Sequence, residues 1–410
     1  MRRIVGFFTE LPIFAIVKFT KVCQVLAWIF AIVAVSNVVG FITLSVGSIY
    51  IPLCGVCLIY ILICGELKFN GLYVVMYIVF GISALLASET YFNSKLRYIL
   101  FLYVTLLCSS CISSSTAIAF RSLVCRNILI LLTFLTIGSF IGYFLGINFA
   151  HISQGTSAVF SSSTNFGGLY AHSMLLGPLS VLVALMFLNV YILYRKKIFI
   201  ALFFVTASAV VMSASRGATL ALVVPIVYLL FFMKDGNGDR KKLIGLLVMA
   251  SIIAVCVGDR FVVGLINKQQ NNVEAGGTFN SRESKWDNRL QEFEENPVFG
   301  IGFCAVDLQH YEDYNEAGGI EPGSTHLAIL SMTGLVGMML YLIVLFVAYK
   351  RVRKNESVVA KMRMCWFLAM ITHAMFEGYA LFAGGFLCFM YWLVIGQCED
   401  YKVIKKQYLL

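Results

Sequence analysis

Uninterrupted apolar runs of about 20 residues recur along this chain, and they constrain its fold more than any other feature. A helix of that length can cross the ~30 Å hydrocarbon core of a membrane. The sequence predicts twelve such spans, at 22–40, 44–64, 71–89, 98–118, 127–148, 171–193, 198–213, 217–233, 243–258, 324–348, 364–378 and 380–397. We therefore expect an all-α polytopic membrane protein.

Composition excludes the soluble alternative. The 410 residues would suffice for two or three soluble domains, but 60% are hydrophobic, 13% are charged, and the mean hydropathy is +0.86. We expect nine spans over 1–258, a polar loop over 259–323, and three spans with a tail over 324–410. The loop should contain short helices, because the apolar residues of 283–294 are spaced to form one face of a helix lying on the membrane surface.

The distribution of basic residues predicts the orientation, because short cytoplasmic loops are enriched in Lys and Arg. With the N-terminus inside, 23 of the 31 Lys and Arg residues fall in inner segments, including Arg121 and Arg126 between the spans 98–118 and 127–148. The long loop is then outside. The net charge of +10 is explained by this topology and by anionic membrane lipids, and no nucleic-acid partner is expected.

Ionisable side chains collect at the predicted outer ends of the spans. Arg216 stands in SASRGA, a tight turn between two short spans, where a recessed arginine is costly unless it meets an anion. The planar guanidinium suits phosphate oxygens, and Arg282 and Arg289 of the loop are further candidates to bind them. The alternatives are a snorkelling Arg216 and a solvated loop helix.

His326 stands near the start of the predicted span 324–348, in the stretch GSTHLAILSMTGLVG, residues 323–337. A neutral imidazole can take a proton from a hydroxyl, and its ordinary pKa of about 6.5 permits this at neutral pH. The alternative is an interfacial histidine without a chemical role. Weaker candidates for substrate binding are Glu321, His172, and the pair His373 and Glu377, which we expect on one face of the span 364–378.

No Asp-x-Asp pair or His/Cys cluster faces outward, so neither a metal nor a cofactor is expected. Arginines and a histidine at a recessed outer site instead suggest a membrane-bound diphosphate as substrate. Its attached group would pass to a hydroxyl, while the arginines stabilise the leaving diphosphate.

Three motifs, SASRGATL, NSRESKW…NPVFGIGF and STHLAILSMTGLVG, occur in this order between residues 200 and 345. Together they resemble the O-antigen polymerase and O-antigen ligase superfamily. The resemblance implies a metal-independent glycosyltransferase that uses an undecaprenyl-diphosphate-linked oligosaccharide at the periplasmic face of the bacterial inner membrane. It also implies that Arg216 and Arg282 hold the diphosphate and that His326 activates the acceptor hydroxyl.

The chain departs from the family pattern at two places. Leu327 follows the histidine where the family often has asparagine, and the loop 149–170 lacks the arginine that polymerases often carry there. These departures leave the choice of acceptor open.

The spacings between motif residues do not distinguish a polymerase from a ligase, because some match each activity. The spacing from Arg289 to Gly300 is associated with polymerases, whereas ligases are associated with the spacings Arg216 to Leu220 and His326 to Gly337. We expect a polymerase, working with a chain-length regulator protein; the alternative is a ligase that transfers the polymer to lipid A-core. A flippase or other transporter fits less well, because its ionisable groups would line a path through the middle of the membrane.

Overall fold

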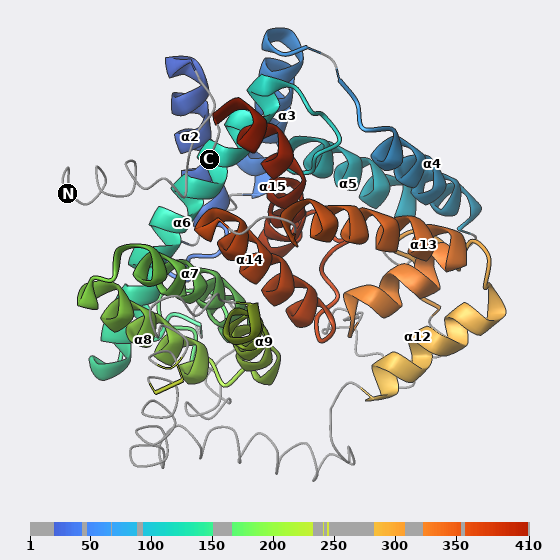
Figure 1. Ribbon diagram of the computed structural model, residues 1–410. Helices are drawn as coiled ribbons and strands as arrows, with labels where there is room; N and C mark the ends of the chain where they lie inside the picture. The colour runs from blue at the N-terminus through green and yellow to red at the C-terminus, as the bar shows by residue number, and fades with distance from the viewer. Residues whose placement is uncertain are drawn as a thin grey trace.

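The computed structural model describes residues 20–42, 47–66, 68–87, 93–150, 166–232, 241, 244–245, 283–307, 323–353 and 357–408. Within these ranges the chain is helical and forms no strand beyond two isolated β-bridges (Figure 1). The helices are α2 (Lys21–Ser36), α3 (Gly47–Cys64), α4 (Gly71–Leu86), α5 (Ser94–Cys108), α6 (Ser115–Phe144), α7 (Ser173–Tyr194), α8 (Lys197–Met212), α9 (Arg216–Phe232), α12 (Glu283–Glu295), α13 (Thr325–Arg353), α14 (Val358–Ala374) and α15 (Phe386–Tyr408). The all-helical prediction is confirmed, and α12 coincides with the predicted amphipathic helix.

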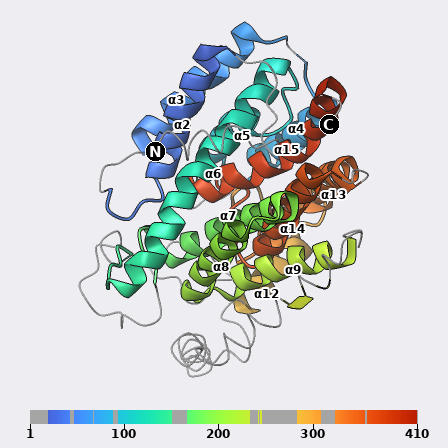
Figure 2. The same cartoon turned by 60° about the vertical axis from the view of Figure 1, so that its left-hand side comes forward.

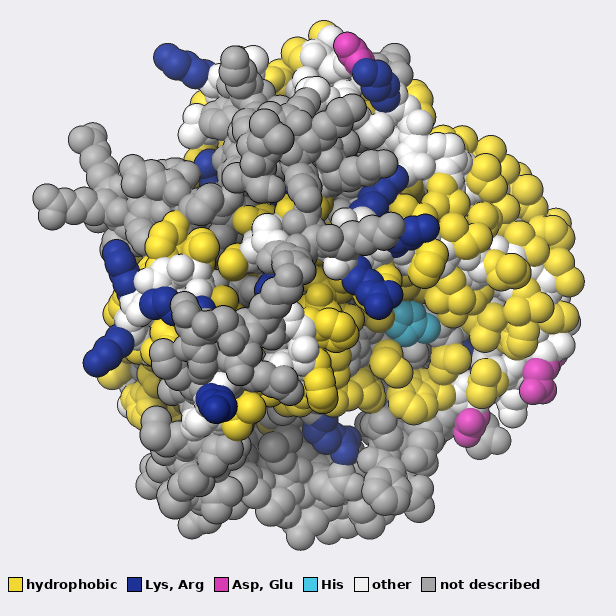
Figure 3. All heavy atoms as spheres, viewed as in Figure 1, with side chains coloured by type: hydrophobic (Ala, Val, Ile, Leu, Met, Phe, Trp, Pro, Cys, Tyr) yellow, Lys and Arg dark blue, Asp and Glu magenta, His cyan; other side chains and the backbone are white. Residues whose placement is uncertain are grey.

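Three of the described helices, α6, α7 and α13, are long and apolar enough to cross a membrane, and five shorter ones are apolar. Hydrophobic side chains cover the face formed by α4, α5 and α13 (Figure 3). Leu85 and Phe346, for example, are 71% and 60% exposed. So large an exposed apolar surface fits a protein surrounded by lipid, and the chain is a polytopic membrane protein. Apart from residues 244–245, the predicted span 243–258 lies outside the described residues.

The prediction of a loop carrying Arg121 and Arg126 is wrong. The hydroxyl of Ser114 caps α6 by accepting from Ala117 N–H, and both arginines lie buried inside that helix. Arg121 donates to the two carboxylate oxygens of Asp400 on α15 at 2.8 and 2.9 Å. Pairing with a carboxylate offsets the cost of burying the charge of Arg121. The enrichment of Lys and Arg in cytoplasmic loops does not anticipate a partner 279 residues away.

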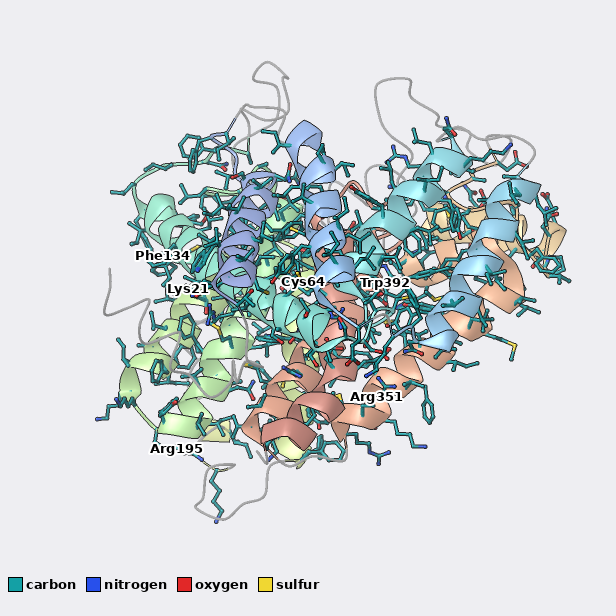
Figure 4. The ribbon with its side chains drawn as sticks, turned by 90° about the horizontal axis from the view of Figure 1, so that it is seen from above. Lys21, Cys64, Phe134, Arg195, Arg351 and Trp392 are labelled. Carbon is teal, nitrogen blue, oxygen red and sulfur yellow. The ribbon has the colours of Figure 1, made fainter. Side chains whose placement is uncertain are left out.

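Aromatic side chains fill the centre of the bundle. Trp392 is fully buried and donates its indole N–H to Ala380 O at 2.9 Å. Its ring contacts those of Phe101 and Tyr341. Figure 4 shows Trp392 surrounded by side chains, with Arg195 at the edge. The buried helix α7 packs against α6, α8, α9 and α14 (Figure 2). The interior therefore places Tyr341 of α13 among rigid aromatic neighbours.

The bundle has two polar ends. At the Asp400 end, carboxylates of Asp400 and Glu399 bind Arg121 and Arg351, each at 2.8 Å. At the His326 end, α13 begins beside the segment 375–385, which connects α14 to α15. The candidate site residues that the structure describes collect at the His326 end.

Candidate active site

Helix α13 is broken where the sequence predicted one continuous span. Gly334 has φ 65° and ψ −170°, which leaves backbone groups on both sides of it without helical partners. The segment that follows α12 supplies the missing hydrogen-bond partners. Ile301 N–H donates to Ser331 O at 2.9 Å, and Leu335 N–H donates to Pro297 O at 2.8 Å. Figure 1 shows the result, two segments of α13 that meet at a sharp bend, with α12 beside the first.

Two glycines permit this close approach. A Cβ on Gly334 would overlap Val298 O, and a Cβ on Gly300 would overlap the backbone of Met332. Both glycines also have positive φ, 65° and 72°. Gly300 of NPVFGIGF and Gly334 of SMTGLVG are therefore explained by one structural feature, the clamped bend of α13.

The bend brings His326 against Tyr341. In a straight helix, residues 15 apart are separated by about 22 Å along the axis. Here His326 precedes the bend, Tyr341 follows it, and His326 Nδ1 lies 3.0 Å from the Tyr341 hydroxyl. The Tyr341 hydroxyl also contacts that of Tyr391 on α15. Both tyrosines are fully buried, whereas His326 is half-buried.

The hydrogen-bond chain through His326 has a definite direction. Nε2 of His326 lies 3.3 Å from Ile371 O, and a carbonyl oxygen only accepts, so Nε2 carries the proton. In the neutral imidazole Nδ1 is then the acceptor, and Tyr341 donates to it. The Tyr341 oxygen accepts in turn from the Tyr391 hydroxyl. Both ring nitrogens of His326 are thus partnered in the described structure.

His373 and Glu377 are not on one helical face, because α14 ends at Ala374. That prediction is wrong: the hydroxyl and the N–H of Thr325 both donate to Glu377 O, which lies in the nonhelical connection to α15. His373 is buried, and its Nδ1 is 3.3 Å from the Tyr379 hydroxyl. The connection therefore fixes the start of α13, next to His326.

Arg216 is exposed and is the first residue of α9, at the short α8–α9 turn predicted from the sequence. Neighbouring Gly217 packs on the side chain of Phe376, so closely that a Cβ on Gly217 would lie 3.2 Å from Phe376 Cβ and 3.3 Å from Cδ2 of the ring. Phe376 is also 6.3 Å, between ring centroids, from Trp286 of α12. The indole N–H of Trp286 donates to Gly323 O at 3.4 Å, three residues before His326. The chain segments that contain Arg216 and His326 are thus linked through Phe376 and Trp286 of α12.

Arg289 was predicted to bind the diphosphate, but the structure places it in a fully buried ion pair with Glu292, at 2.8 Å. Its Nη1 also lies 3.3 Å from Ser331 Oγ, at the bend of α13. Glu292 accepts from Asp307 N–H at 3.0 Å. In this arrangement Arg289 supports the bend and is shielded from solvent.

Three other candidates are placed as follows. His172 caps α7 by accepting from Met174 N–H at 3.1 Å. Arg282 and Glu321 lie outside the described residues. Among the residues that the structure does describe, no group of three His, Cys, Asp or Glu side chains could hold a metal ion.

Sequence reasoning missed Tyr341, Tyr391 and Glu292. A tyrosine in an apolar span is an ordinary core residue, and only the bend makes Tyr341 a neighbour of His326. The glycine of MTG was the available signal, because glycine inside a helix often marks a break. Glu292 stands three residues after Arg289, a spacing that favours an ion pair on a helix.

Comparison with known protein families finds a match, which overlaps this part of the chain. No curated protein matches the chain. Residues 201–342 match the sequence model of a family described as O-antigen ligase. The matched segment contains Arg216, the bend at Gly334 and His326. Residues 201–342 are therefore similar to the O-antigen polymerase and ligase superfamily, the superfamily that the three sequence motifs resemble.

Proposed function

We propose that the protein transfers a glycan from a lipid-linked diphosphate to an acceptor hydroxyl. The observation that carries this proposal is the convergence of Arg216 and His326 at one end of the bundle, within the segment that matches the family. Each stands in the first turn of a helix, α9 or α13, where backbone N–H groups favour anions. The arrangement offers hydrogen-bond donors to a diphosphate.

In the proposed reaction the acceptor oxygen attacks the anomeric carbon of the donor sugar. The bond from that carbon to the diphosphate oxygen breaks, and the lipid diphosphate leaves with the bonding electrons. Arg216 and Arg282 neutralise the charge that develops on the leaving group, so the arginines lower the barrier more than they tighten ground-state binding. The acceptor hydroxyl loses its proton as the new glycosidic bond forms.

The choice of acceptor gives the first test. We propose a polymerase, on the spacing from Arg289 to Gly300, with a repeat unit on undecaprenyl diphosphate as acceptor; the second candidate is a ligase, the description given to the matched family. We expect a deletion strain to keep single-repeat lipopolysaccharide and lose the longer ladder on a gel. Complete loss of O-antigen, with polymer accumulating on the lipid carrier, would instead identify a ligase.

The orientation in the membrane gives the second test. We propose that the His326 end faces the periplasm, as the excess of basic residues elsewhere predicts. A cysteine replacing Asn272 should react with an impermeant thiol reagent in cells whose outer membrane alone is permeabilised. Cys64, the only exposed cysteine among the described residues, and Cys256 are first replaced by serine. A cysteine replacing Asn355 is the control and should react only after lysis; the reverse pattern would overturn the orientation.

The third test concerns metals. We propose that arginines do the work that a divalent cation does in other diphosphate-using enzymes. Transfer by the purified protein should therefore continue in EDTA at an unchanged rate. An activity abolished by EDTA and restored by Mg²⁺ or Mn²⁺ would contradict the assignment of Arg216 and Arg282.

A further inference from the structure

The orientation of His326 limits what it can do to a substrate. A neutral imidazole has one lone pair in its plane, and in His326 that lone pair is on Nδ1. Nδ1 faces the Tyr341 hydroxyl, which is fully buried and held by Tyr391. A substrate can reach Nδ1 only by displacing a buried side chain. Nε2–H has a weaker partner, Ile371 O at 3.3 Å, which a substrate oxygen can replace.

We propose that Tyr341 fixes His326 in the tautomer with its proton on Nε2, so that His326 meets the diphosphate as a hydrogen-bond donor. The inference rests on the proposed transfer function and replaces the proton-accepting role expected from the sequence. Diphosphate oxygens only accept hydrogen bonds, and an N–H at the first turn of α13 matches them. The proton of the acceptor hydroxyl is then released to water. Tyr341 acts through His326 and is a positioning residue.

The first arm of the test compares substitutions of His326. The carboxamide nitrogen of glutamine reaches about as far from the backbone as Nε2 and also donates, but glutamine cannot take a proton. We expect His326→Gln to retain activity within about tenfold of wild type, the size of effect of one altered hydrogen bond. His326→Asn has the same chemistry on a shorter side chain and should be as inactive as His326→Ala. Equal inactivity of the Gln and Ala variants, with active wild type, would overturn the donor role.

The second arm is a double-mutant cycle. Tyr341→Phe keeps the ring in its buried site and removes only the hydroxyl, so we expect a loss of about tenfold in kcat in the wild-type background. A glutamine side chain has no imidazole tautomer for Tyr341 to fix, so Tyr341→Phe should lower kcat only slightly in the His326→Gln background. A purely structural role of Tyr341 predicts equal losses in both backgrounds and would overturn the proposal.

The matched control for the cycle is Tyr77→Phe. Tyr77 is also a buried tyrosine whose hydroxyl contacts another hydroxyl, that of Ser109 at 3.0 Å. It does not contact His326, so we expect unchanged activity in both backgrounds. This control measures the general cost of removing a buried tyrosine hydroxyl from the bundle.

The third arm reads the tautomer directly. In protein labelled with ¹⁵N-histidine, the His326 signals are those lost in His326→Gln. We expect Nε2 protonated and Nδ1 unprotonated in wild type, and a tautomer mixture in Tyr341→Phe. A proton on Nδ1 in wild type would overturn the proposal. Failure of the proposed function has a different signature, namely no transferase activity in wild type or full activity in His326→Ala.

Discussion

Arg216→Lys should reduce the transfer rate by about 10²-fold or more, although it keeps the positive charge. The planar guanidinium donates two parallel hydrogen bonds to phosphate oxygens, and an ammonium group cannot reproduce that geometry. Arg216 is exposed and begins α9, so the substitution should leave folding intact. The measurement is the rate of transfer by purified protein at matched concentrations, with lipid-diphosphate-linked repeat unit as substrate.

Arg195→Lys is the matched control. Arg195 is also an exposed arginine in a short turn between two helices, α7 and α8, but it lies in a segment that the sequence assigns to the inner side. We expect its rate to stay within about twofold of wild type, the usual range for an exposed residue without a special role. If Arg216→Lys behaved in the same way, Arg216 would be an ordinary interfacial residue and the site would need another anion-binding group.

Hydropathy predicted most of the helices because lipid imposes one rule on every spanning segment, namely internal backbone hydrogen bonding beneath an apolar surface. The rule is local, so it needs no knowledge of neighbours. It also found the α8–α9 turn and, through its amphipathic pattern, α12. Arg216 and His326 were singled out because ionisable groups are rare in such a chain.

The features that sequence reasoning missed all depend on contacts distant along the chain. Arg121 is stable inside α6 because Asp400 approaches it from α15. The break in α13 depends on the chain after α12, which donates and accepts the hydrogen bonds that Gly334 interrupts. A single sequence contains the glycine but gives no indication of the segment that will pair with it. The same limit applies to Arg289, whose charge suggested a ligand and whose burial with Glu292 indicates support of the bend.

His326→Ala should lower the transfer rate by roughly 10²- to 10³-fold, the usual cost of removing a donor that stabilises charge in a transition state. Expression and binding of the donor lipid should be largely retained, because the side chain is half-buried and its loss leaves α13 clamped through Gly334. Undiminished activity of His326→Ala at normal protein levels would remove His326 from the site.

The pH dependence separates the two roles of His326 most sharply. A proton acceptor must be neutral, so the rate would fall as the pH drops through the pKa of His326. A donor through Nε2–H keeps that hydrogen when the ring becomes an imidazolium, so acid does not remove it. We therefore expect wild type and His326→Gln to show the same acid limb in their pH profiles, set by groups other than His326. A limb present in wild type and absent in His326→Gln would show that His326 takes the proton, in which case Tyr341 must move away from Nδ1 during the reaction.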